Sequence, residues 1–225
     1  MKKKVLALIM STIVTSTLFL TGCGGGANKP ANSTSQNAAK TLIYAQGSDP
    51  RGLDPAYVDD GESAKVIVNV YEGLLKYKDG STELEPCLAK SWDISKDGKE
   101  YTFKLREGVK FHDGTPFNAD AVKYNIERQL PPNVKEDMPY ASFTFGEVQK
   151  VEKIDDYTVK IILKQPYTPF LANLAMCLAA PMASPEAIKK NNGNINEAPV
   201  GTGPFKFVSW KKGEAITLEK NNDYW

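Results

Sequence analysis

The chain has 225 residues, with 28 lysines and arginines against 27 aspartates and glutamates and a formal net charge of +1. This balance excludes a nucleic-acid-binding protein that depends on a clustered basic surface. Hydrophobic residues make up 41% and charged residues 24% of the chain, which is typical of a globular protein. Three cysteines and one histidine are too few for a zinc cluster of the usual kind, so we expect no metal site and no cofactor.

The N-terminal residues predict export. Three lysines at positions 2–4 precede an uncharged, mostly apolar stretch over residues 5–20. A basic segment, an apolar segment and a small-residue exit form the layout of a secretory signal. A permanent transmembrane helix is the alternative, although a span needs ~20 apolar residues and this stretch is interrupted by serines and threonines. We expect residues 1–22 to be a signal peptide.

The signal ends in Leu-Thr-Gly-Cys, with Cys23 directly before three glycines. This ending resembles the lipobox of bacterial lipoproteins, whose cysteine is lipidated and becomes the first residue of the mature protein. An ordinary secretory signal with an incidental cysteine is the alternative. The resemblance implies a palmitate-type membrane anchor on Cys23, outside the cytoplasm, at the outer face of the plasma membrane or in the periplasm. Residues 23–40, rich in Gly, Asn, Ser and Ala, predict a flexible linker.

Folded structure is expected from residue 41 onward. Residues 41–47 have the composition of a short strand that ends at Gly47, and the Asp-, Pro- and Gly-rich stretch after it predicts a loop. Apolar residues recur at helical spacing over residues 62–76, where Asp60 is a suitable N-cap. Three β-hairpins follow in the remaining chain. Their strands are expected at residues 91–94 and 101–105, 147–154 and 157–164, and 205–210 and 215–220.

A helix is predicted between the first two hairpins. Asn118 can cap it, Phe117 can pack onto its first turn, and Pro131 ends it. Residues 166–176 and 184–191 predict two shorter helices. Hairpins mixed with helices favour a mixed α/β (α+β) fold over a purely parallel sheet. The expected buried stripe of the first helix is Ala119, Val122, Ile126 and Leu130.

The search for catalytic motifs is negative. The sequence contains no Gly-x-Ser-x-Gly elbow, no Walker A loop and no zincin motif. His112 is the single histidine and lies beside an Asp-Gly turn, where a structural hydrogen-bonding role is favoured over catalysis. We therefore predict no catalytic residue. Export permits a Cys87–Cys177 disulfide, but the apolar run around Cys177 also suits a free thiol, so both states remain open.

Two loops are candidate binding elements. Asp59 and Asp60 follow a Pro-containing loop and precede a helix, so they either line a cleft that receives an ammonium group or simply cap the helix. Gly201, Thr202 and Gly203 form a small-residue loop in which glycine permits close backbone approach. A tight turn is the alternative, and a single Gly-Thr-Gly is a weak signal by itself.

Residues 89–128 closely resemble the signature region of solute-binding protein family 5. These are the extracytoplasmic receptors of ABC importers for peptides, dipeptides, nickel complexes and related solutes. Residues 53–77, 155–171 and 199–225 resemble further parts of the same family. The resemblance covers residues 41–225.

The resemblance implies a lobe of the type II periplasmic-binding-protein fold with an inserted small α+β domain. The inserted subdomain is expected at about residues 60–180, and the first lobe at residues 41–59 and 181–225. Family members are usually more than twice as long, so the resemblance implies that the second lobe is missing and that the chain is truncated. Weak or absent solute binding by the 225-residue form is the corresponding expectation.

The resemblance also implies a function without catalysis. The expected receptor captures di- or oligopeptides, closes around them as a monomer, and delivers them to an ABC permease and ATPase. A nickel chelate, haem, a sugar or a signalling peptide is the alternative solute, and an extracytoplasmic enzyme or an adhesin is a further alternative. The residues expected to approach the solute are Gly47, Ser48, Asp59, Asp60, Gly61, Gly201, Thr202 and Gly203.

Overall fold

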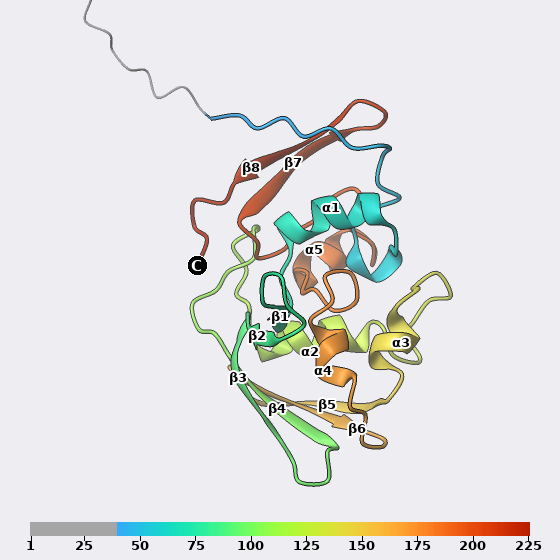
Figure 1. The fold of residues 1–225 in the computed structure, drawn as a ribbon, viewed down its shortest axis with the longest axis vertical. Helices are drawn as coiled ribbons and strands as arrows, with labels where there is room; N and C mark the ends of the chain where they lie inside the picture. Colours follow the sequence, from blue (N-terminus) through green and yellow to red (C-terminus); the bar gives the residue numbers. More distant parts are fainter. Residues whose placement is uncertain (1–39) are drawn as a thin grey trace, which may run out of the picture. The chain divides into compact units, whose positions relative to one another are not determined.

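The computed structural model of this chain describes residues 40–225, and its elements are labelled in Figure 1. A compact unit extends from Tyr44 to Trp225. The predicted signal peptide over residues 1–22, the lipidated Cys23 and all but the last residue of the predicted linker lie outside the described residues.

The expected strand over residues 41–47 is not formed, so this prediction is wrong. The segment pairs with none of the described strands, and Leu42 and Ile43 are each 90% exposed. A strand requires a partner for its backbone N–H and C=O groups. Strand-like composition alone cannot provide that partner.

Helix α1 (Gly61–Val70) begins as predicted and ends earlier than predicted. The Asp60 side chain caps it by accepting a hydrogen bond from Ser63 N at 2.9 Å. The helix stops because Tyr71 adopts an extended conformation, with φ −122° and ψ 159°. Beyond it, Leu74 and Leu75 are buried in a different hydrophobic cluster from Val70. The apolar residues at 71–74 therefore lie in a connector, and Leu75 begins strand β1 (Leu75–Tyr77), so they do not continue the helix.

Two of the three predicted hairpins combine into one antiparallel sheet. It contains β3 (Ala89–Ile94), β4 (Glu100–Leu105), β5 (Val148–Asp155) and β6 (Thr158–Leu163) in the order β3-β4-β6-β5. The pairing of β4 with β6, with Phe103 opposite Val159, joins the two hairpins. One face of the sheet is buried, and its alternating side chains include Tyr101, Phe103, Leu105, Val159, Ile161 and Leu163.

Helix α2 (Ala119–Glu127) contacts β5 and β6 of this sheet. Asn118 caps it, as predicted, by accepting a hydrogen bond from Ala121 N at 3.0 Å. Its side chains at Ala119, Val122 and Ile126 are buried. Leu130, the fourth residue of the predicted stripe, is only partly buried and lies beyond the end of the helix.

The third hairpin is also confirmed. Strands β7 (Phe205–Lys211) and β8 (Ala215–Lys220) pair around a turn in which Gly213 has φ +75°. The two predicted short helices are present as α4 (Phe170–Leu174) and α5 (Pro185–Lys190). Four elements were not predicted: the 3-10 helix η1 (Pro55–Tyr57), β1 (Leu75–Tyr77), β2 (Leu84–Pro86) and α3 (Ala141–Phe145).

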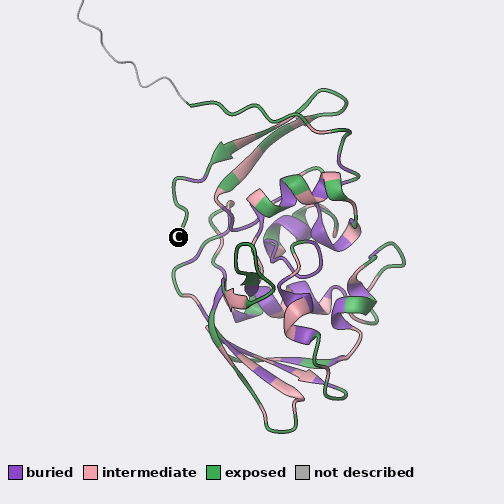
Figure 2. Ribbon diagram, in the orientation of Figure 1, coloured by how far each residue is buried: buried purple, intermediate pink, exposed green. Residues whose placement is uncertain are grey.

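Buried side chains gather in two main clusters, and Figure 2 shows the exposed outer segments around them. The first cluster contains the four-stranded sheet with α2 and α4, and the second contains α1 and α5 with the inner side of β7 and β8. Two connectors between the clusters, at residues 71–74 and 178–183, are joined because Met182 N donates to Glu72 O at 2.8 Å. The predicted boundaries of the subdomain (60–180) and the first lobe (41–59 and 181–225) remain a prediction.

The described architecture is a mixed α/β fold, as predicted. Cys87 and Cys177 are both free in it, and Cys87 is buried whereas Cys177 is exposed. No described helix is long and apolar enough to cross a membrane.

Candidate functional site

Helix α1 separates the residues that were expected to approach a solute. Gly47, Ser48 and Asp59–Asp60–Gly61 lie near its N-terminal end, because Asp60 is the cap and a Cβ placed on Gly47 would lie 3.8 Å from Glu62 Oε1. Gly201–Thr202–Gly203 lie at its C-terminal end, against Val70. A ten-residue helix is about 15 Å long. The structure therefore holds the two groups apart.

Gly47 and Ser48 form an exposed segment. The Gln46 side chain donates to Ser48 O at 2.8 Å and thereby holds the turn. Asp49 Oδ2 accepts a hydrogen bond from Gly213 N at 2.6 Å, which fastens the segment to the β7–β8 turn. The hydrogen bonds of Gln46 and Asp49 hold the segment on either side of Gly47 and Ser48. The backbone of these two residues faces solvent and not the core.

The paired carboxylates have separate partners. Asp60 accepts hydrogen bonds from Ser63 N at 2.9 Å and Ser63 Oγ at 2.6 Å. Burial by itself raises the pKa of Asp60, but the side-chain and backbone hydrogen bonds from Ser63 outweigh burial and lower the pKa. Asp59 is exposed and forms an ion pair with Arg51 Nη1 at 2.6 Å. The capping interpretation accounts for Asp60, and Asp59 alone presents its carboxylate to solvent.

The Gly201–Gly203 loop is buried against the end of α1. A Cβ on Gly201 would lie 2.1 Å from Val70 O, and one on Gly203 would lie 2.7 Å from Asn69 O. Gly203 N also donates to Val70 O at 2.9 Å. Glycine is required at both positions by this close backbone approach. Thr202 is completely buried, so its side chain faces no solvent.

His112 holds this loop in place. Its backbone N donates to Gly201 O, and its ring Nε2 lies 2.9 Å from Gly203 O. Gly201 N approaches the ring Nδ1 at 3.4 Å. This pattern assigns the proton to Nε2, because Nε2 faces a carbonyl and Nδ1 faces an N–H group. Burial lowers the pKa of His112, so the ring is neutral near pH 7.

Asp113 and Ser184 form a contact that the sequence did not indicate. Ser184 Oγ donates to Asp113 Oδ2 at 2.5 Å and also caps helix α5. Thr115 donates a second hydroxyl to Asp113, at 2.6 Å. A serine nucleophile requires its hydroxyl to face a general base, whereas Ser184 donates to a carboxylate and both ring nitrogens of His112 contact the Gly201–Gly203 backbone. The side chains of Ser184, His112 and Asp113 therefore have structural roles and do not form a catalytic arrangement.

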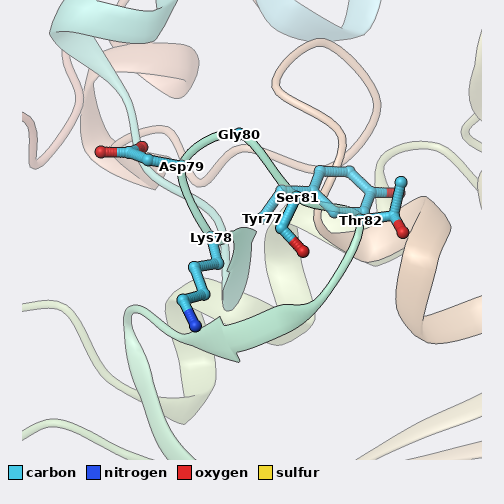
Figure 3. Close-up of a pocket in the computed structure, with 6 residues that line it drawn as sticks. All are labelled: Tyr77, Lys78, Asp79, Gly80, Ser81 and Thr82. Atoms are coloured by element: carbon cyan, nitrogen blue, oxygen red, sulfur yellow. The ribbon is translucent and has the colours of Figure 1, made fainter.

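Two surface hollows are lined by none of the expected binding residues. One, of about 790 Å³, is formed by six consecutive residues of the β1–β2 hairpin, Tyr77–Thr82. Figure 3 shows these residues. A second, of about 260 Å³, is lined by Glu197, Phe207, Ser209, Trp210 and Lys212. In the second hollow Lys212 pairs with Glu197 and lies 5.3 Å from the centre of the Trp210 ring. Within residues 40–225, no group of three or more His, Cys, Asp or Glu side chains is arranged to hold a metal ion.

The chain is similar to known solute-binding proteins. Residues 83–225 match the family described as bacterial extracellular solute-binding proteins, family 5 Middle. The chain therefore belongs to this family, as the resemblance of residues 89–128 predicted.

Three relatives illustrate the similarity. The glutathione-binding protein GsiB of Pectobacterium atrosepticum is 44% identical over 189 residues, which are 84% of this chain and 36% of that protein. Heme-binding protein A of Haemophilus influenzae is 40% identical over 240 aligned residues, covering 95% of this chain and 43% of that protein. The periplasmic binding protein DppA of Helicobacter pylori, solved with the peptide STSA, has a TM-score of 0.71 and 41% identity over 80% of this chain and 38% of its own.

These matches confirm a fold of the type II periplasmic-binding-protein class. The chain spans less than half the length of each of these relatives. The relatives are named as binding proteins, which agrees with the prediction of a protein without catalytic activity.

Proposed function

We propose that this member of family 5 contributes to the substrate-binding component of an ABC importer for peptides. The single observation that carries the proposal is the similarity to DppA, which was solved with the peptide STSA and shares 41% identity with this chain. The glutathione-binding relative adds support, since glutathione is itself a tripeptide. In this proposal the receptor binds its solute outside the cytoplasm and presents it to a membrane permease driven by an ATPase.

We propose the exposed Gly47–Ser48 segment as the first solute contact. Its backbone groups face solvent and are positioned by Gln46 and Asp49. Backbone N–H and C=O groups recognise the constant amide ladder of a peptide and tolerate many side chains. Asp59, with its exposed carboxylate, is the proposed partner for a cationic group, in competition with Arg51.

Asp60, Gly61 and the loop of Gly201, Thr202 and Gly203 remain predicted binding residues. Asp60 uses its carboxylate to cap α1, and Gly61 is exposed beside it. Thr202 is completely buried, so direct contact with a solute requires the loop to open. We propose that the loop contributes through its backbone after such a rearrangement.

We propose that the mature protein is a monomer anchored by lipid on Cys23, after removal of residues 1–22. The support is the Leu-Thr-Gly-Cys sequence at the end of the apolar stretch. One acyl chain gives only reversible membrane binding, so stable attachment needs more than one. Metabolic labelling with alkyne-palmitate tests the anchor, with Cys23→Ser as the matched control. Label that persists in Cys23→Ser would contradict the assignment.

Haem is the second candidate solute. Heme-binding protein A covers 95% of this chain in its alignment, more than the glutathione-binding relative does. A nickel chelate, a sugar and a signalling peptide follow from the family resemblance alone. These candidates differ in charge and aromaticity, and one panel of solutes separates them.

The test is uptake by cells. The gene is deleted, and uptake of radiolabelled dipeptide, tripeptide, haem, nickel chelate and sugar is compared with that of the parent and of a complemented strain. The peptide proposal expects loss of peptide uptake with haem uptake unchanged. Loss of haem uptake alone would favour the second candidate, and unchanged uptake of every solute would contradict the receptor function.

A further inference from the structure

Glu72 lies where the two connectors between the hydrophobic clusters meet. Its backbone oxygen accepts a hydrogen bond from Met182 N at 2.8 Å. Its half-buried carboxylate accepts three further hydrogen bonds from two distant parts of the chain. Thr202 Oγ1 and Trp225 Nε1 each lie 2.8 Å from Glu72 Oε2, and the Tyr224 hydroxyl lies 2.7 Å from Oε1.

The segment that carries Tyr224 and Trp225 is also held at its beginning. Asn221 is buried, and its backbone N donates to Pro204 O at 2.8 Å. Its side-chain amide donates to Gly203 O at 3.1 Å. Residues 221–225 are therefore attached to the Gly201–Gly203 loop at one end and to Glu72 at the other.

The Trp225 indole is held on its face as well as at its edge. The Arg106 guanidinium lies 4.6 Å from the centre of the ring, within the range of a cation–π interaction. Arg106 is itself oriented because its Nε donates to Cys87 O at 2.6 Å. A cation on the face and a carboxylate at the N–H edge complement the charge distribution of an indole. The indole position is thus set by two charged groups, and Glu72 is the one that reaches the Gly201–Gly203 loop.

We infer that Glu72 is a positioning residue that couples the Gly201–Gly203 loop to residues 221–225. The coupling follows from the single oxygen, Oε2, that serves both Thr202 and Trp225. An ionised carboxylate is an acceptor only, so it holds several donors at once, and its hydrogen bonds are stronger than neutral ones. Movement of one donor therefore changes the geometry of the other. If the loop contacts solute, as the proposed function holds, the position of Trp225 will change with that contact. The coupling itself does not depend on the proposed function.

Indole N–H resonances of the ¹⁵N-labelled chain test the coupling directly. The chain has three tryptophans, and Trp225→Phe assigns the relevant signal. The hydrogen bond to Glu72 predicts a Trp225 N–H that moves upfield in Glu72→Ala and moves less in Glu72→Gln, which keeps one acceptor oxygen. The decisive variant is Thr202→Val, which leaves Glu72 intact. It shifts the Trp225 signal more than those of Trp92 and Trp210, whereas Thr102→Val on the four-stranded sheet leaves it in place.

Limited proteolysis measures how firmly the segment is held. Trypsin cleaves after Lys220, next to the buried Asn221. Glu72→Ala raises the cleavage rate there about tenfold or more, because the open form becomes more populated when charge-assisted hydrogen bonds are lost. Glu85→Ala, which removes an exposed ion pair with Lys76, leaves the rate unchanged.

The inference is overturned if Thr202→Val leaves the Trp225 signal in place. It is equally overturned if a folded Glu72→Ala chain shows wild-type cleavage at Lys220. Should Glu72→Ala fail to fold, Glu72→Gln and Thr202→Val decide the question. Both measurements are made without solute, so unchanged peptide uptake in the deletion strain would contradict the proposed function and leave this inference standing.

Discussion

Arg128 and Asp54 form a two-point ion pair in the protein interior. Arg128 Nη2 lies 2.7 Å from Asp54 Oδ1 and Nη1 lies 3.1 Å from Oδ2. Asp54 is completely buried, and it also accepts hydrogen bonds from Ala56 N and Ile195 N. This one carboxylate therefore connects the end of α2 to two loops that are far apart in the sequence.

Asp54→Asn is expected to destabilise the protein by about 3–5 kcal/mol, because it leaves the Arg128 charge buried without a counter-charge. Urea unfolding followed by circular dichroism measures the loss. Asp59→Asn is the matched control, since its ion pair with Arg51 is exposed and is worth about 0–1 kcal/mol. A loss in Asp54→Asn as small as that in Asp59→Asn would contradict the prediction that an unpaired Arg128 charge is costly.

Gly201→Ala tests the close approach between the loop and α1. An added Cβ would lie 2.1 Å from Val70 O, so the loop must move away from the helix, and overpacking of this kind typically costs about 1–3 kcal/mol. Thermal unfolding measures the change. At Gly61 a Cβ meets nothing within 4 Å, so Gly61→Ala is expected to be neutral or stabilising. A Gly201→Ala chain as stable as Gly61→Ala would contradict the close contact.

His112 is expected to make stability depend on pH in mildly acidic solution. Burial lowers its pKa from the ordinary 6.5, so the unfolded chain binds a proton at a higher pH than the folded chain does. Stability is therefore fully present above about pH 6.5 and falls as the pH decreases below that value. The lowered pKa values of Asp60 and Asp113 also make stability fall with decreasing pH, but in a more acidic range, below their ordinary pKa of 3.8.

Urea midpoints measured between about pH 7.5 and about pH 5 test this prediction. His112→Gln, which keeps an amide donor for Gly203 O, flattens the dependence, because the chain has no second histidine. A wild-type midpoint that stays constant over this range would contradict a buried, neutral ring.

The two described cysteines are expected to react very differently. Burial raises the pKa of Cys87 to about 12, and burial raises the pKa of Cys177 to a smaller degree. Only Cys177 is exposed, and the thiolate is the reactive form. Iodoacetamide followed by mass spectrometry should label Cys177 slowly in the native protein and Cys87 only after unfolding. Native labelling of Cys87, or a Cys87–Cys177 disulfide under non-reducing conditions, would contradict the structure.

Local signals in the sequence predicted most elements correctly. Asp60 and Asn118 cap their helices as expected, and the Asp-Gly turn near Gly98 joins β3 to β4. Caps and tight turns depend on neighbouring residues only. Short elements that lack such signals, including β1, β2 and α3, were missed.

The candidate site was less predictable. Asp60 and Gly201 were expected near a solute, yet one caps α1 and the other is buried against its far end. The residues that hold the loop, His112 and Glu72, are distant from it in the sequence. No local sequence pattern around His112 or Glu72 identifies the residues that each contacts. His112 was predicted to have a structural role, but its partner loop was not.

The sequence by itself determined the hairpins and the helix caps, because each depends on periodicity or on adjacent residues, and its resemblance over residues 41–225 indicated the family. Only the tertiary structure decided that α1 ends at Val70, that residues 41–47 have no partner strand, and that Asp54 meets Arg128. These outcomes depend on burial and hydrogen bonding between segments far apart in the chain. Such contacts arise from packing in three dimensions, and the spacing of residues along the sequence does not reveal them.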